Sequence, residues 1–218
     1  MNPYYQDKWV TIYHGDCREI LPQLDVKVDL VLTDPPYGKI GGSKAIGGSN
    51  FVSVNSYDLS WDYEPINRAT LELIRKMSVH QIIWGANYFW DCLPPTNSLI
   101  IWDKKCQNNW DDTFSDGEIA WTSMGKKLTI FRFLWVGALR QGNYSHRQHP
   151  TEKPQELMRW CIAYAGQGIK SIADPFVGIG ATLQAAKFFN IPSIGIEIEE
   201  KYCEIAARRC SQEVMELV

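Results

Sequence analysis

The chain has 218 residues, of which 45% are hydrophobic and 22% are charged, and its formal net charge at pH 7 is −3. This length suits one domain with a substantial core, and the composition is typical of a soluble globular protein. The small net charge argues against a general polyanion-binding protein, and no apolar run approaches the ~20 residues that a transmembrane helix needs.

The cysteines and histidines show no spacing that indicates a metal site or a disulfide framework. No Cys-x-x-Cys pair occurs, and the four histidines lack metal-ligand spacing. The first residues show no basic region followed by an apolar one, so we expect no signal peptide. We therefore predict a cytoplasmic protein without a metal, whose cysteines are reduced and mostly packed. They are Cys17, Cys92, Cys106, Cys161, Cys203 and Cys210.

Short apolar runs and amphipathic runs alternate along the chain. Strands are predicted over 9–14, 28–34, 81–85, 99–103, 118–123, 128–135, 170–174 and 193–197, and helices over 65–77, 154–165, 181–189 and 200–215. The alternation predicts a doubly wound α/β fold with a mostly parallel sheet. Residues 118–135 are interrupted by Gly125-Lys126-Lys127, which predicts a β-hairpin.

A glycine-rich turn follows the strand at 170–174. Gly178 and Gly180 allow close approach of a ligand at a helix N-terminus, and Glu197 ends the next strand at about the ~20-residue spacing of an acid that binds ribose. Leu183 occupies the third glycine position of the nicotinamide fingerprint, and Asp174 would repel a pyrophosphate but attract a cation. S-adenosylmethionine fits this pattern. The alternative is a tight turn without a ligand.

The sequence Asp34-Pro35-Pro36-Tyr37 ends the strand predicted at 28–34. Asp34 and the Pro35 carbonyl are each able to accept one hydrogen of an exocyclic amino group, which orients the nitrogen lone pair for attack on a methyl group. Tyr37 offers an aromatic face for an extruded base. Two half-sites, one for a methyl donor and one for an amino group, are therefore expected at one sheet edge.

These motifs together resemble the β class of S-adenosylmethionine-dependent DNA amino-methyltransferases, which methylate adenine N6 or cytosine N4. Asp34-Pro35-Pro36-Tyr37 precedes Phe176-Val177-Gly178-Ile179-Gly180, in the permuted motif order of that class. The stretches His149-Pro150-Thr151-Glu152-Lys153-Pro154 and His14-Gly15-Asp16-Cys17 are similar to two further family patterns. The resemblance covers nearly the whole chain and implies one methyltransferase domain over 1–218, Rossmann-like and circularly permuted.

The resemblance also implies a role for each matching residue. Asp34, Pro35, Pro36 and Tyr37 would be catalytic, Asp16 and Cys17 would meet the cofactor adenine, and Glu197 would bind its ribose. Phe176, Gly178, Gly180 and Thr182 would form the turn around the cofactor, and Asp174 would be the acid near its methionine end. Thr151 and Lys153 would reach the methionine carboxylate.

The first residue of the catalytic tetrapeptide bears on the target base. Asp in this place is commoner among adenine-N6 enzymes, so the resemblance implies methylation of a flipped adenine in double-stranded DNA. Cytosine N4, an RNA or protein amide, and a non-catalytic nucleic-acid-binding subunit remain alternatives. Methylation at cytosine C5 is not expected, because the chain has no Pro-Cys dipeptide.

The residues that would recognise a specific DNA sequence do not match a family motif. Family members usually carry a sizeable insertion before the segment at 149–154, and this chain has little room for one. We expect recognition by 38–57 and 137–148, by a partner subunit, or within a homodimer. Residues 124–153 hold six basic side chains against Glu152 alone, which predicts either phosphate contacts or a solvated surface.

Overall fold

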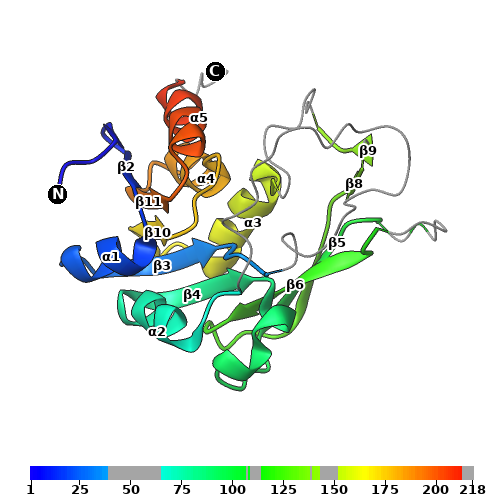
Figure 1. Cartoon of the computed structure of the whole chain (residues 1–218). Coiled ribbons are helices and arrows are strands. Elements are labelled where there is room, and N and C mark those ends of the chain that lie inside the picture. Colours follow the sequence, from blue (N-terminus) through cyan, green and yellow to red (C-terminus); the bar gives the residue numbers. More distant parts are fainter. Residues whose placement is uncertain (39–64, 107, 109–113, 138, 143–151, 213–218) are drawn as a thin grey trace.

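The computed structural model describes residues 1–38, 65–106, 108, 114–137, 139–142 and 152–212. This part of the chain is built on a nine-stranded sheet in the order β1-β2-β11-β10-β3-β4-β6-β5-β7 (Figure 1). Its strands are β1 (Tyr5–Gln6), β2 (Val10–His14), β3 (Val28–Thr33), β4 (Ser78–Trp84), β5 (Leu99–Asp103), β6 (Gly117–Thr122), β7 (Thr129–Arg132), β10 (Ile172–Asp174) and β11 (Ser193–Glu197). Strands β8 (Trp135–Val136) and β9 (Leu139–Arg140) form a separate pair.

The centre of the sheet is parallel. Strands β2, β11, β10, β3 and β4 all run in one direction. At one edge of the sheet, β6 pairs antiparallel with both β4 and β5, and β7 pairs parallel with β5. At the other edge, β1 pairs antiparallel with β2. The predicted α/β class with a mostly parallel sheet is therefore confirmed.

Helices cover both faces of the sheet (Figure 1). On one face lie α1 (Cys17–Ile20) and α2 (Arg68–Lys76), and on the other lie α3 (Gln155–Ala165), α4 (Ala181–Phe188) and α5 (Glu200–Ser211). Both faces of the sheet are apolar because successive side chains of a buried strand point to opposite faces. In β3, Leu30 and Leu32 pack with α3 and α4, whereas Val31 packs with α1 and α2. Single 3₁₀ turns are η1 (Leu21–Gln23), η4 (Ala86–Tyr88) and η5 (Trp90–Cys92).

Helix α2 begins later than the predicted 65–77 run. Tyr37 and Pro65 form an antiparallel bridge, so the residues before the helix return to the end of β3. Asn67 then caps the helix, its side chain accepting a hydrogen bond from the Thr70 backbone N–H at 2.9 Å. The start of α2 therefore lies against the proposed catalytic turn.

The hairpin predicted over 118–135 is wrong. Strands β6 and β7 do not pair, because β5 lies between them. The Lys126 backbone N–H donates to Ser98 Oγ at 3.0 Å, and Lys126 Nζ donates to the Tyr164 carbonyl. These contacts hold the segment between β6 and β7 beside Ser98, the residue that precedes β5. Strand β7 then pairs with β5 on the edge opposite β6, parallel to β5.

Large aromatic side chains lie in the core. Trp84, Trp102 and Trp121, which lie on β4, β5 and β6, are at most 3% exposed. All six cysteines are free thiols, and four of them are buried. Within the described ranges, we find no helix that combines the length and apolar character needed to cross a membrane.

Candidate active site

Four neighbouring parallel strands bring the proposed site residues to one sheet edge. Strands β2, β11, β10 and β3 end next to Asp16, Glu197, Asp174 and Asp34 respectively. Thr33 Oγ1 donates to Asp174 Oδ1 at 2.6 Å, and the Gly15 N–H donates to the Glu197 carbonyl at 2.8 Å. The carboxyl ends of parallel strands are where open α/β sheets bind ligands.

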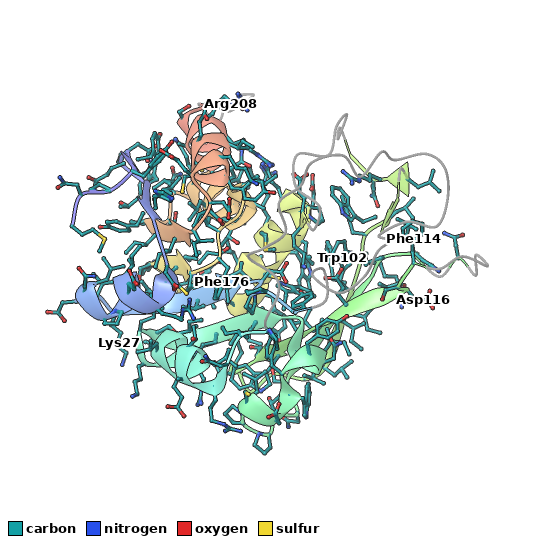
Figure 2. All side chains as sticks on the ribbon, in the orientation of Figure 1. Lys27, Trp102, Phe114, Asp116, Phe176 and Arg208 are labelled. Atoms are coloured by element: carbon teal, nitrogen blue, oxygen red, sulfur yellow. The ribbon has the colours of Figure 1, made fainter. Side chains whose placement is uncertain are left out.

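A cavity of about 420 Å³ lies at this edge and joins the two half-sites. Its lining includes Asp16, Cys17, Asp34, Pro36, Lys153, Asp174, Phe176, Gly178, Thr182 and Glu197. Phe176 lies near the centre of the molecule, far from the Phe114 and Asp116 end of the sheet (Figure 2). The turns that begin at Asp34 and at Asp174, some 140 residues apart in sequence, both line this cavity.

Glu197 is fixed by the turn that it faces. Its carboxylate accepts hydrogen bonds from the Gly178 N–H at 2.8 Å and the Glu199 N–H at 2.9 Å. Burial raises the pKa of Glu197 to about 7, although these two N–H groups favour the charged form. The predicted spacing between the glycine turn and this acid is thus realised as a direct contact.

The two glycines of the turn differ in their surroundings. Gly178 has a φ of +53°, and a Cβ added there would meet no protein atom within 4 Å. Gly180 has a φ of +88°, and a Cβ there would lie 3.2 Å from the Cβ of Ala206 on α5. Gly178 therefore lines open space in the cavity, whereas Gly180 permits α4 to begin close to α5.

Asp174 is buried at the end of β10. Its Oδ1 accepts hydrogen bonds from Thr33 Oγ1 and from the Phe176 N–H, the latter at 3.1 Å. Burial raises the pKa of Asp174 to about 6, while the hydroxyls of Thr182 and Thr33 oppose this change. Within the described residues, neither Asp174 nor Glu197 forms an ion pair.

Asp16 and Cys17 lie at the start of α1. Asp16 is the N-cap residue and accepts from the Arg18 N–H at 2.8 Å, while the Arg18 guanidinium pairs with its carboxylate. The hydrogen bond from the Arg18 side chain lowers the pKa of Asp16. Burial raises the pKa of the Cys17 thiol to about 12, so Cys17 lines the cavity as a neutral group.

The catalytic turn holds Asp34 among donors. Tyr37 Oη donates to Asp34 Oδ1, and Lys153 Nζ lies 2.5 Å from Asp34 Oδ2. The Pro36 carbonyl accepts from the Ile66 N–H at 3.3 Å. No described residue donates a hydrogen bond to the Pro35 carbonyl, which leaves that oxygen as an acceptor.

Tyr37 is held on two sides. Its ring stacks on Tyr88, with 4.6 Å between the ring centroids and an interplanar angle of 28°. A Cβ at Gly85 would lie 1.9 Å from Tyr37 Cε1, so glycine at the end of β4 makes room for the ring. Lys153 Nζ also lies over the ring, 5.7 Å from its centroid.

Lys153 was predicted to reach the methionine carboxylate of the cofactor. It lines the cavity, but its ammonium is shared between Asp34 and Glu118, at 2.5 and 2.8 Å. The geometry therefore supports a role beside Asp34. Among the basic residues of 124–153 that the structure describes, Lys153 is buried and Arg132 pairs with Asp103 at 3.4 Å.

Some predicted residues lie outside the described part of the chain, and some site residues were missed. The residues outside the described part are Thr151 and most of the two recognition segments, of which only Gly38, Gly137 and residues 139–142 are described. The residues missed are Arg18 and Asn67, which line the cavity, Gly85 and Tyr88, which contact Tyr37, and Glu118 and Lys104, which connect to Asp34 through Lys153. A sequence signal existed only for Glu118, the one charge in the strand run 118–123.

The cavity fits a cationic nucleoside. Two buried carboxylates that pair with no cation in the described part of the chain line it, and Gly178 leaves space beside them where a side chain would otherwise project. The acid that would face a ribose, Glu197, is already oriented by two backbone N–H groups. A phosphate-containing ligand fits less well, because Asp174 lies beside the glycine turn.

Comparison with known proteins agrees with this reading. A family model described as DNA methylase, N6_N4_Mtase, matches residues 80–208. The chain is 25% identical over 254 residues to the type II methyltransferase M2.DpnII of Streptococcus pneumoniae, covering 97% of this chain and 93% of that protein.

Two solved structures share the fold. The M1.HpyAVI–SAM complex has a TM-score of 0.56 and 21% identity, with 92% of this chain and 98% of that chain covered. The cytosine-N4-specific PvuII DNA methyltransferase has a TM-score of 0.62 and 13% identity, with 99% and 92% covered. Since the family model spans more than half of the sequence, the chain belongs to the DNA methylase family of N6 and N4 amino-methyltransferases.

Proposed function

We propose that this protein transfers a methyl group from S-adenosylmethionine to the N6 amino group of adenine in DNA. The observation that carries the proposal is the junction of the two half-sites. The ends of β3 and β10, which carry Asp34 and Asp174, are adjacent and line one cavity, and Thr33 at the end of β3 donates a hydrogen bond to Asp174. The solved relative M1.HpyAVI was determined as a complex with S-adenosylmethionine.

The cofactor half-site would hold the donor through its acidic residues. When bound, S-adenosylmethionine supplies an electrophilic methyl group on a sulfonium. The Asp174 carboxylate places negative charge beside the glycine turn, which favours a cation there. Glu197 offers lone pairs to ribose hydroxyls, and Asp16 with Cys17 lines the part of the cavity assigned to adenine.

The catalytic half-site would act on the target amino group. Asp34 and the Pro35 carbonyl accept its two hydrogens, which turns the nitrogen lone pair toward the cavity. Because the Asp34 side chain is only 17% exposed, a base must leave the DNA stack to reach it. Asp at this position, where cytosine-N4 enzymes more often have Ser, favours adenine as the base.

One of the two proposed DNA-recognition segments directly follows the catalytic turn in the chain. Gly38 directly follows Tyr37, and Pro65 bridges to Tyr37, so both described ends of the segment 39–64 lie at this turn. We propose that 38–57 and 137–148, or a partner subunit, read the DNA sequence, and that 1–218 acts as one domain.

The decisive experiment incubates the protein with tritium-labelled S-adenosylmethionine and unmethylated duplex DNA of mixed sequence, then digests the DNA to nucleosides. Label in N6-methyladenine supports the proposal. Label only in N4-methylcytosine overturns the choice of adenine. Cofactor binding without transfer to DNA overturns the enzymatic role in DNA and favours a binding subunit. An Asp34→Asn protein serves as the inactive control.

A further inference from the structure

Four charged side chains from four separate elements form a chain of alternating sign behind the cavity. Lys153 Nζ contacts Asp34 Oδ2 at 2.5 Å and Glu118 Oε2 at 2.8 Å, and Lys104 Nζ contacts Glu118 Oε1 at 2.8 Å. Asp34 follows β3, Lys153 precedes α3, Glu118 lies on β6, and Lys104 follows β5. The Lys153 side chain is 5% exposed, and the other three are 17–23% exposed.

Only one end of this chain reaches the reaction site. Asp34 and Lys153 line the cavity, but Glu118 and Lys104 do not. Glu118 therefore acts on the target amino group only through Asp34, by sharing the Lys153 ammonium and by charge repulsion. Two positive and two negative charges leave the group neutral, which is the condition under which buried charges are tolerated.

The sharing of one ammonium has a chemical consequence for Asp34. A carboxylate fully paired with a lysine is a weaker hydrogen-bond acceptor than one that shares the lysine with a second carboxylate. Glu118 competes with Asp34 for the Lys153 ammonium, and Lys104 keeps Glu118 itself charged. Tyr37 Oη, which accepts from Lys153 Nζ at 3.3 Å, is a further polar group at this junction.

We propose that Glu118 is a positioning residue for methyl transfer, which sets the orientation and acceptor strength of Asp34 through Lys153, with Lys104 as its counter-charge. This inference rests on the proposed function, because it requires Asp34 to accept from the target amino group. It adds two residues outside the cavity to the catalytic apparatus.

The electrostatics of the four groups agree with this geometry. Burial alone would raise the pKa of Glu118, but Lys153 and Lys104 overcome it and lower this pKa to about 2. Burial raises the pKa of Asp34, Lys153 opposes the rise, and Glu118 adds to it. Asp174, on the neighbouring strand, is a further carboxylate that repels Asp34. Glu118 and Lys153 thus act on Asp34 in opposite directions.

The test titrates Asp34 in the cofactor-free protein by carbon-13 NMR of its carboxyl group, assigned with Asp34→Asn. Glu118→Gln should lower the pKa of Asp34, since a repelling charge is lost. Lys153→Met and Lys104→Met should raise it. Asp116→Asn is the matched control, because it removes a charge two residues from Glu118 at a side chain that is 87% exposed. It should leave the pKa of Asp34 unchanged.

Turnover gives the second readout. Glu118→Gln should slow single-turnover methyl transfer by about tenfold while the cofactor Kd stays within twofold. The inference is overturned if folded Glu118→Gln protein leaves the pKa of Asp34 unchanged or raises it, or if the rate does not fall. Lys104→Met tests the same coupling should Lys153→Met fail to fold. Wild-type protein that does not methylate DNA defeats the proposed function, whereas the NMR titration still tests the coupling.

Discussion

The two halves of the active site hold buried carboxylates in opposite electrostatic settings. In the glycine-turn half, Asp174 and Glu197 accept hydrogen bonds from N–H groups and hydroxyls, and burial raises their pKa values to about 6 and 7. In the catalytic half, Asp34 and Glu118 share the ammonium of Lys153. The same side-chain chemistry is hydrogen-bonded in one half and ion-paired in the other.

This difference matches what each half would bind. Carboxylates without counter-cations leave negative charge available to a cationic cofactor. An internally neutral cluster presents acceptor atoms to an uncharged amino group without attracting stray cations. Substitutions in the two halves should therefore separate cofactor binding from methyl transfer.

Asp34→Asn should have the largest effect. It keeps the side-chain shape but removes the charge and replaces one acceptor oxygen with a donor. We expect single-turnover transfer to fall by about 10²- to 10³-fold, the usual loss for one stabilising group in a transition state. The cofactor Kd, measured by calorimetry, should stay within a few-fold. Loss of cofactor binding would contradict the division into two halves.

The pH dependence of stability should reveal the glycine-turn half. The folded pKa of Glu197, about 7, lies above its ordinary value of 4.5, so the folded protein binds more protons than the unfolded chain between these values. Its contribution to the free energy of unfolding should fall by about 3 kcal/mol as pH rises from 4.5 to 7. Asp174 should add a smaller decrease up to about pH 6.

Denaturant unfolding of the cofactor-free protein measures this slope, with Glu197→Gln as the comparison. The variant should show a flatter dependence, because its side chain does not titrate. Glu199→Gln, a neighbouring and more exposed acid, is the matched control; its charge makes only a minor contribution to the raised pKa of Glu197, so the slope should stay close to that of the wild type. Equal slopes in wild type and Glu197→Gln would contradict the prediction.

The two glycines of the turn should separate binding from folding. Gly178→Ala places a Cβ in open space, so we expect about tenfold weaker cofactor binding and a backbone cost of about 1 kcal/mol at its φ of +53°. Gly180→Ala adds a contact with Ala206, so it should lower the free energy of unfolding by about 2 kcal/mol. Calorimetry and thermal unfolding distinguish them. Similar effects from both variants would show that the glycines share one role.

Tyr37→Phe should have the smallest effect. It removes the hydroxyl that donates to Asp34 but keeps the ring and its stacking on Tyr88. Because Lys153 still holds Asp34, we expect a three- to tenfold slower single turnover, about 1 kcal/mol, and unchanged cofactor affinity. Tyr37→Leu, which also loses the ring, should be slower still. An unaffected Tyr37→Phe enzyme would show that Lys153 alone orients Asp34.

Local sequence was sufficient for most elements of the fold. The apolar run over 28–34 forms β3 because every side chain from Leu30 to Thr33 is buried. The partners of β6 and β7 were mispredicted, because Gly125-Lys126-Lys127 resembles a hairpin turn. Its contacts with Ser98 and Tyr164, distant in sequence, hold the connection beside the start of β5 instead.

The sequence by itself determined the chemistry of both turns and the expectation that they meet. Asp34 and Asp174 follow strands, and parallel strands end at a common edge. Only the tertiary structure decided what surrounds them. Lys153, which was expected at the cofactor, lines the cavity and also pairs with Asp34 and Glu118, a contact that the sequence did not indicate. Contacts between residues far apart in sequence depend on strand order and side-chain packing, and spacing along the chain carries no record of either.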